Sequence, residues 1–111
     1  MISYVTIGTN NLEAGAKFYD AVLGVFGASR AFETGNFISW KTTAGGPMVS
    51  LNKPYDGNAA TVGNGTMVAL SAESPELVDA IHEKALELGA KDEGAPGPRG
   101  TTGAYYCYFR D

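Results

Sequence analysis

The stretch ISYVTIG at residues 2–8 decides the fold of this chain, because a related stretch, TMVALSA, follows at residues 66–72. Apolar, aromatic and β-branched residues dominate both stretches, which predicts a strand at each place. The two are offset by about 63 residues, so that Tyr4 corresponds to Met67. An internal repeat of this period indicates two copies of one structural unit.

A predicted helix follows each of these strands. After the first strand, Asn10 is the expected N-cap and Glu13 stands three residues later, as in a capping box; apolar residues at helical spacing extend the helix over about residues 11–24. After the second strand, Ser74 is the expected N-cap of a helix that ends at Gly89. The same strand-helix pattern therefore occurs twice in the sequence.

Short extended runs separated by turn residues complete the pattern. Three runs follow the first helix, at residues 29–33, 36–42 and 48–53. After the second helix come a short strand at 90–93, a flexible Gly/Pro loop at 94–103 and a strand at 104–110.

We therefore expect an α+β fold in one domain over residues 1–111. It consists of two βαβββ modules, at about residues 1–54 and 65–111, that form a curved mixed sheet around a cleft with the helices outside. The second module lacks its last strand, which would leave an open sheet edge. An omitted tail, a truncated product or a partner chain that covers the edge would each account for this.

Composition excludes several classes of function. Hydrophobic residues make up 44% and charged residues 18% of the 111 residues, as in an ordinary globular domain. The net charge of −4, with scattered basic residues, argues against nucleic-acid binding. We expect no signal peptide and no membrane span. The lone cysteine, Cys107, allows no intrachain disulfide and fits a cytoplasmic protein.

Several motifs in order resemble the glyoxalase branch of the vicinal oxygen chelate superfamily, which contains glyoxalases, bleomycin-resistance proteins and extradiol dioxygenases. They are MISYVTIG at residues 1–8, FYDAVLG at 18–24, KPYDG at 53–57, GNGT at 63–66 and YYCYFRD at 105–111. The resemblance covers the whole chain. It implies a cleft that holds a divalent metal in active relatives, and a homodimer, because relatives usually pair.

The same resemblance assigns metal-ligand positions whose residues do not suit a metal. The first ligand, usually His, falls on Tyr4, and the second, often His, falls on Met67. A further ligand, a glutamate on the final strand, would lie after Asp111. The fourth strand, at residues 48–53, carries no carboxylate. A thioether is soft and a neutral phenol is a poor ligand. We expect no cofactor, unless a further C-terminal strand supplies a carboxylate to a divalent metal.

Residues expected to line the cleft and bind a small molecule are Tyr4, Thr6, Trp40, Ser50, Asn52, Met67, Arg99, Tyr106 and Tyr108. Tyr4 is interpreted as a phenolate ligand, a hydrogen-bonding contact or a ring that fills the cleft, and Met67 as a soft ligand or a packing residue. Arg99 either clamps an anionic substrate when its loop closes or is solvated. His82 lies off the apolar helix stripe and is expected on the surface.

Three hypotheses of function remain open. The first is a metal-free protein that binds a small, partly aromatic or cationic molecule, as bleomycin-resistance relatives bind a drug without reacting with it. The second is a glyoxalase-like lyase or isomerase with unusual metal ligands or none. The third is an interaction protein with a vestigial cleft. Fold alone does not decide among them.

Overall fold

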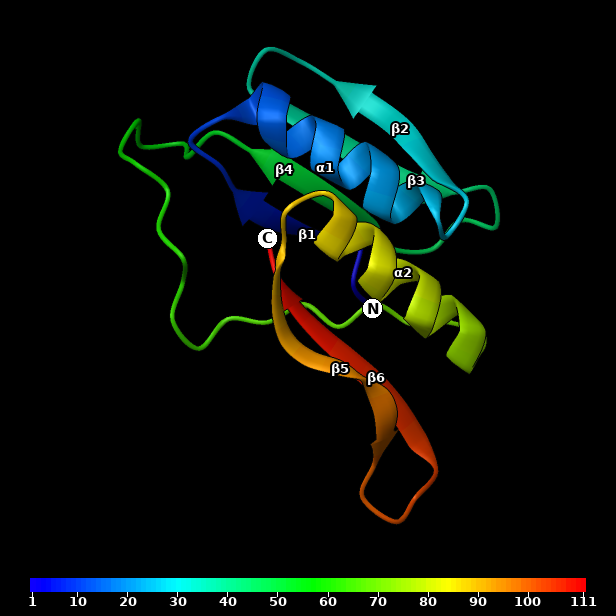
Figure 1. Cartoon of the computed structure of the whole chain (residues 1–111). Helices are drawn as coiled ribbons and strands as arrows, with labels where there is room; N and C mark the ends of the chain where they lie inside the picture. Colours follow the sequence, from blue (N-terminus) through cyan, green and yellow to red (C-terminus); the bar gives the residue numbers. More distant parts are fainter. The chain divides into compact units, whose positions relative to one another are not determined.

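The chain folds into two units, Met1–Ala69 and Leu70–Asp111, in a computed structural model that describes all 111 residues. The first unit contains β1 (Tyr4–Gly8), α1 (Leu12–Gly24), β2 (Ala28–Glu33), β3 (Phe37–Thr42) and β4 (Met48–Asn52). The second contains α2 (Pro75–Glu87), β5 (Lys91–Arg99) and β6 (Ala104–Arg110) (Figure 1). The predicted α+β class is confirmed, with one four-stranded mixed sheet and one two-stranded sheet.

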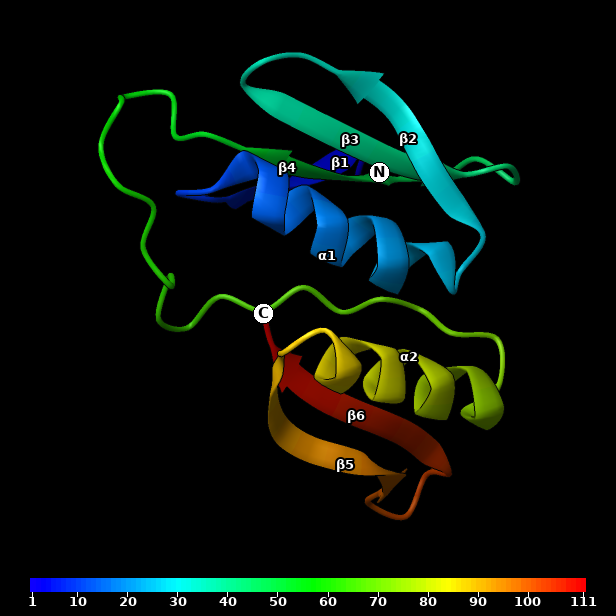
Figure 2. The same cartoon turned by 45° about the horizontal axis from the view of Figure 1, so that its top comes forward.

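The first unit is a complete βαβββ module. Its strands lie in the order β1-β4-β3-β2; β1 runs parallel to β4, and the other neighbours are antiparallel. Helix α1 covers one face of this sheet (Figure 2). The core forms between them from apolar side chains of the helix and of alternate strand positions, which are Ala16, Tyr19, Leu23, Ile38, Trp40 and Leu51.

Helix α1 begins one residue later than its predicted cap implies. Its N-cap is Asn11, whose side-chain oxygen accepts a hydrogen bond from the Ala14 amide at 3.0 Å. Asn10 has a different role: its carboxamide accepts from the Ala60 amide at 2.7 Å and donates to the Ala60 carbonyl at 3.1 Å. Asn10 therefore ties the long connection after β4 to the start of α1.

Residues 66–72 form no strand, which corrects the sequence prediction. The corresponding strand of the first unit, β1, has β4 as its only strand neighbour. The second unit contains no strand in the position of β4. Backbone N–H and C=O groups of an extended segment need a neighbouring strand to form a ladder, so β propensity alone does not produce a strand here.

Helix α2 and the β5–β6 hairpin pack together in the second unit. The Ser74 hydroxyl caps α2 as predicted, since it accepts from the Leu77 amide at 3.2 Å. Strand β5 is longer than predicted and continues through the expected Gly/Pro loop to Arg99. Two irregularities in its pairing with β6, on either side of Gly94, accommodate these residues in the hairpin. Neither helix of the chain has the length and apolar character that crossing a membrane requires.

Candidate functional site

The sheet face of the first unit that α1 leaves uncovered carries four of the nine predicted binding residues, Tyr4, Thr6, Ser50 and Asn52. Side chains alternate along each strand, so the core residues Leu51 of β4 and Ile38 of β3 place their neighbours on the opposite face. We call this the helix-free face. Its residues, related by the strand register, are Tyr4, Thr6, Phe32, Phe37, Ser39, Lys41, Met48, Ser50 and Asn52.

Two buried serines lie at the centre of the helix-free face. The hydroxyls of Ser39 and Ser50 are 2.7 Å apart in a mutual hydrogen bond, and both residues are buried. Thr6 lies beside Ser50 in the strand register, whereas Tyr4 on the edge strand β1 is 59% exposed. The floor of this face is therefore made of small hydroxyl side chains, with a large ring exposed at its edge. Sequence reasoning did not single out Ser39.

Asn52 lies at the end of the helix-free face and has an unsatisfied acceptor. Its side-chain oxygen is buried and has no hydrogen-bond partner. Gly8 is its register neighbour, and a Cβ built on Gly8 would lie 3.3 Å from the Cβ of Ala60. The connection after β4, held at Ala60 by Asn10, therefore lies close to Gly8 at this end of the face.

The donor groups at the family's metal positions do not fit a divalent ion. Tyr4 is on the helix-free face with no carboxylate or imidazole beside it, and Met67 is 70% exposed in the unpaired segment. No three His, Cys, Asp or Glu side chains gather anywhere in the chain. Zinc, nickel, iron and manganese need nitrogen or charged oxygen donors. The exposure of Met67 also corrects its interpretation as a packing residue.

Trp40 is a core residue and takes no part in the helix-free face, contrary to the sequence prediction. It is 1% exposed and packs against Tyr19, with the ring centroids 5.9 Å apart. Its indole N–H donates to Asp20 of α1 at 2.8 Å. Alternation along β3 puts Trp40 on the same face as the core residue Ile38 and puts Ser39 on the other face.

Arg30 of β2 completes this contact between helix and sheet. Its guanidinium donates twice to the Asp20 carboxylate, at 2.9 and 2.7 Å, and once to Glu33 at 2.9 Å. These hydrogen bonds from Arg30 hold the pKa of Asp20 below its usual value. Burial opposes this shift, and the hydrogen bond from the Trp40 indole adds a smaller contribution in the same direction as Arg30. The hydrogen bonds to Asp20 and Glu33 raise the pKa of Arg30. Asp20 is therefore charged at neutral pH.

Tyr106 and Tyr108 form a second group of predicted residues, within the second unit. They lie on the side of β6 away from α2, because Tyr105 donates to Asp79 of α2 at 2.8 Å and the Cys107 thiol contacts the Val78 carbonyl at 3.8 Å. Tyr106 and Tyr108 are partly exposed, and each pairs with a glycine of β5. Burial raises the pKa of Cys107, which makes it a poor nucleophile.

Arg99 ends β5 and is not part of a flexible loop, which corrects the sequence interpretation. Its guanidinium donates to the Ala95 carbonyl at 2.6 Å. It also lies over Gly97, where a Cβ would approach its Nη1 to 3.1 Å. A clamp that closes on a substrate would first have to break this hydrogen bond.

His82 is buried, contrary to its predicted place on the surface. It is 7% exposed, and its Nε2 lies 3.1 Å from a carboxylate oxygen of Asp92 on β5. The buried side of α2 includes His82 in addition to the apolar residues Ile81 and Ala85, because β5 also covers this position. The same Asp92 oxygen accepts from the Gly94 amide at 2.9 Å, and this hydrogen bond, followed by that from His82, lowers the pKa of Asp92.

Comparison with known proteins agrees with this architecture. A glyoxalase/bleomycin resistance protein from Albidiferax ferrireducens T118 is 35% identical, with a TM-score of 0.89, over 100% of this chain and 89% of that one. Hypothetical protein SA1046 from S. aureus is 21% identical, with a TM-score of 0.73, over 100% and 84%. A glyoxalase-related enzyme from Fulvimarina pelagi is 17% identical, with a TM-score of 0.69, over 100% and 80%. No curated protein matches.

The family model that matches residues 1–111 describes the Glyoxalase/Bleomycin resistance protein/Dioxygenase superfamily. A match over the whole length, together with the complete βαβββ module, identifies the family. This chain belongs to the Glyoxalase/Bleomycin resistance protein/Dioxygenase superfamily.

Proposed function

We propose that this protein binds a small molecule on the helix-free face of its first unit without the help of a metal. The observation that supports it best is the buried Asn52 oxygen, which lacks a hydrogen-bond partner. A buried acceptor left unpaired costs about 1–3 kcal/mol, so a ligand N–H or O–H that reaches it is favoured. The chemistry of the two family ligand positions, a neutral phenol at Tyr4 and a thioether at Met67, supports the metal-free part of the proposal.

The ligand that suits this face is a small, partly aromatic molecule with a hydrogen-bond donor. An ammonium group is one such donor. The donor would pair with Asn52, and the aromatic part would lie against Phe37, the register neighbour of Asn52 on β3. Such binding without reaction fits the bleomycin-resistance members of the superfamily. We also propose a homodimer, since β1 is an edge strand and Ile2 and Tyr4 are exposed there. The single cysteine is consistent with a cytoplasmic location.

Metal content separates this proposal from a glyoxalase-like lyase or isomerase. Purified without chelator, the protein is expected to contain far less than one equivalent of nickel, zinc, iron or manganese by elemental analysis. Incubation with an excess of each ion, followed by desalting, is expected to leave this result unchanged, because thioether and neutral hydroxyl donors bind these ions poorly. One equivalent of bound metal would contradict the proposal and favour the lyase or isomerase.

Ligand binding at Asn52 is tested with the compound that gives the largest saturable NMR shifts in a screen of aromatic amines, alcohols and amides. Replacing Asn52 by alanine is expected to weaken its binding about tenfold, the equivalent of one hydrogen bond to a desolvated acceptor. Asn64→Ala, in the turn at residues 63–66 and outside this face, is the matched control and is expected to leave affinity unchanged. Equal affinity of the Asn52 variant and wild type, or no saturable compound at all, would argue against the proposal.

A further inference from the structure

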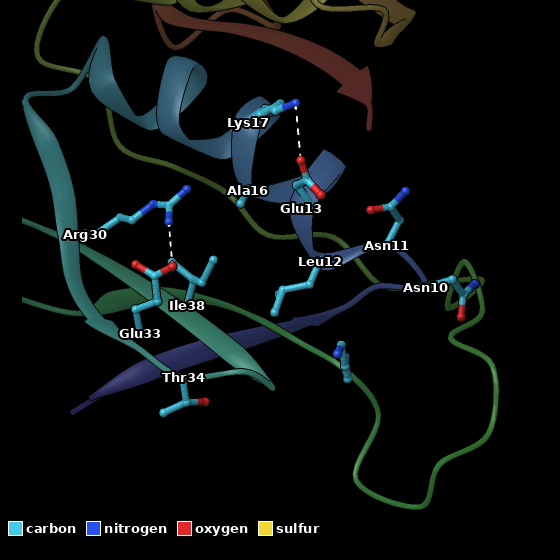
Figure 3. Close-up of a pocket in the computed structure, with 11 residues that line it drawn as sticks. Asn10, Asn11, Leu12, Glu13, Ala16, Lys17, Arg30, Glu33, Thr34 and Ile38 are labelled. Carbon is cyan, nitrogen blue, oxygen red and sulfur yellow. Dashed lines mark hydrogen bonds and ion pairs between the residues drawn. The ribbon is translucent and has the colours of Figure 1, made fainter.

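A hollow opens on the side of the same sheet where α1 packs, opposite the helix-free face (Figure 3). Its volume is about 520 Å³, within the range of about 300–1,000 Å³ that is typical of small-molecule sites. The start of α1, strand β2, the adjoining part of β3 and the residue after β4 line it. It shares no residue with the helix-free face. Four separate segments build it, which is why the sequence alone does not indicate it.

The inner part of the hollow is apolar. Leu12 and Ala16 of α1 and Ile38 of β3 supply these side chains (Figure 3). Ala16 and Ile38 belong to the core and are 1% and 4% exposed, so Leu12, which packs against them, supplies most of the accessible apolar surface. The packing of helix on sheet holds all three in place. A rigid apolar floor of this kind suits the hydrocarbon part of a ligand.

Charges at the rim are paired, with one exception. Glu13 pairs with Lys17 at 3.6 Å, and Glu33 pairs with Arg30 at 2.9 Å. Arg30 also donates through Nε and Nη2 to the Asp20 carboxylate, so its charge is paired twice. Lys53 is exposed, and its ammonium group has no ion pair or hydrogen bond within the chain. The backbone at Lys53 is nevertheless fixed, because its amide donates to the Asn36 carbonyl at 2.8 Å.

We propose that this hollow binds a small monocarboxylate with an apolar body. The carboxylate pairs with the Lys53 ammonium, and the body lies on Leu12, Ala16 and Ile38. A cationic ligand would have to displace Arg30 or Lys17 from its carboxylate partner, and a dianion would find only one unpaired cation. One unpaired charge next to an apolar floor therefore selects a single anionic group with a hydrocarbon tail.

The experiment is an NMR titration of the full chain with hexanoate, and with hexylamine as a probe of equal size and opposite charge. Hexanoate is expected to shift the methyl signals of Leu12, Ala16 and Ile38 in a saturable manner, and hexylamine is expected not to. Lys53→Met is expected to weaken hexanoate binding about fivefold, as for the loss of one exposed ion pair. The matched control Lys91→Met, at an exposed lysine of β5 in the second unit, is expected to leave it unchanged.

A second variant, Lys53→Glu, reverses the charge and is expected to abolish hexanoate binding and to favour hexylamine. Lys53 is exposed and outside every strand and helix, so both variants should keep the dispersed spectrum of the folded protein. Three results would each overturn the proposal: no saturable shifts at these methyl groups, equal binding of hexanoate and hexylamine, or hexanoate binding that Lys53→Met leaves unaltered. Because the hollow and the helix-free face share no residue, these results do not depend on the proposed function.

Discussion

Replacing Trp40 by alanine is expected to lower the free energy of unfolding of the first unit by about 3–5 kcal/mol, as for other large-to-small substitutions of buried aromatic residues. Trp40 is among the largest fully buried side chains and contacts Tyr19 of α1 across the core. Its removal leaves a cavity between helix and sheet that neighbouring side chains fill only in part. Urea or guanidinium unfolding, followed by circular dichroism, measures the change.

Tyr4→Ala is the matched control for this prediction. Tyr4 was proposed from the sequence as a cleft residue together with Trp40, yet its ring is 59% exposed at the edge of the sheet. Its replacement is expected to change stability by about 0.5 kcal/mol or less, as for ordinary surface positions. If Trp40→Ala were as mild as Tyr4→Ala, Trp40 would not be the core residue described above.

Replacing Asp20 by alanine is the second large effect that we expect, with a loss of about 1–3 kcal/mol. Asp20 accepts the indole N–H of Trp40, which is too deeply buried to hydrogen-bond to water instead. The variant also leaves Arg30 without its two hydrogen bonds to α1. Asp20→Asn keeps an oxygen acceptor for the indole and is expected to lose less. Equal stability of Asp20→Ala and wild type would contradict this role.

The contribution of Asp20 also depends on pH in a defined direction. Its pKa in the folded protein is lowered from the usual 3.8, chiefly by the hydrogen bonds from Arg30. A carboxylate whose pKa is lowered on folding stabilises the protein fully above its unfolded pKa and loses this contribution as the pH falls through its folded pKa. The stability difference between wild type and Asp20→Asn should therefore be largest at neutral pH and shrink below about pH 4. A difference that grows on acidification would contradict the assignment.

Local sequence patterns were sufficient for most of the elements. The five elements of the first unit and helix α2 with its Ser74 cap lie close to their predicted bounds, because alternation, helical spacing and capping residues act over a few neighbouring positions. The helix cap of the first unit was placed one residue early, since Asn10 and Asn11 are adjacent and equally able to cap. Only a contact with Ala60, 50 positions away in the chain, distinguishes them.

The candidate site was less accessible to sequence reasoning. Alternation shows that Ser50 and Asn52 share a face, and Leu51 the other, but it does not show which face a helix covers. Trp40 was therefore assigned to the wrong side of the sheet. His82 was placed on the surface because a helix pattern alone does not indicate how far β5 extends over it. Residues from four separate segments line the hollow at Lys53, so no local sequence pattern indicates it.

The sequence by itself determined the family, the α+β class and the order of elements in the first unit, since motifs, periodicity and caps are properties of neighbouring residues. Only the tertiary structure decided that residues 66–72 stay outside any sheet, that Trp40 and His82 are buried, and that Asn52 keeps an unpaired acceptor. The physical reason is the same in each case. A strand needs a partner for its backbone, and burial and hydrogen bonding depend on which distant segment packs against a residue.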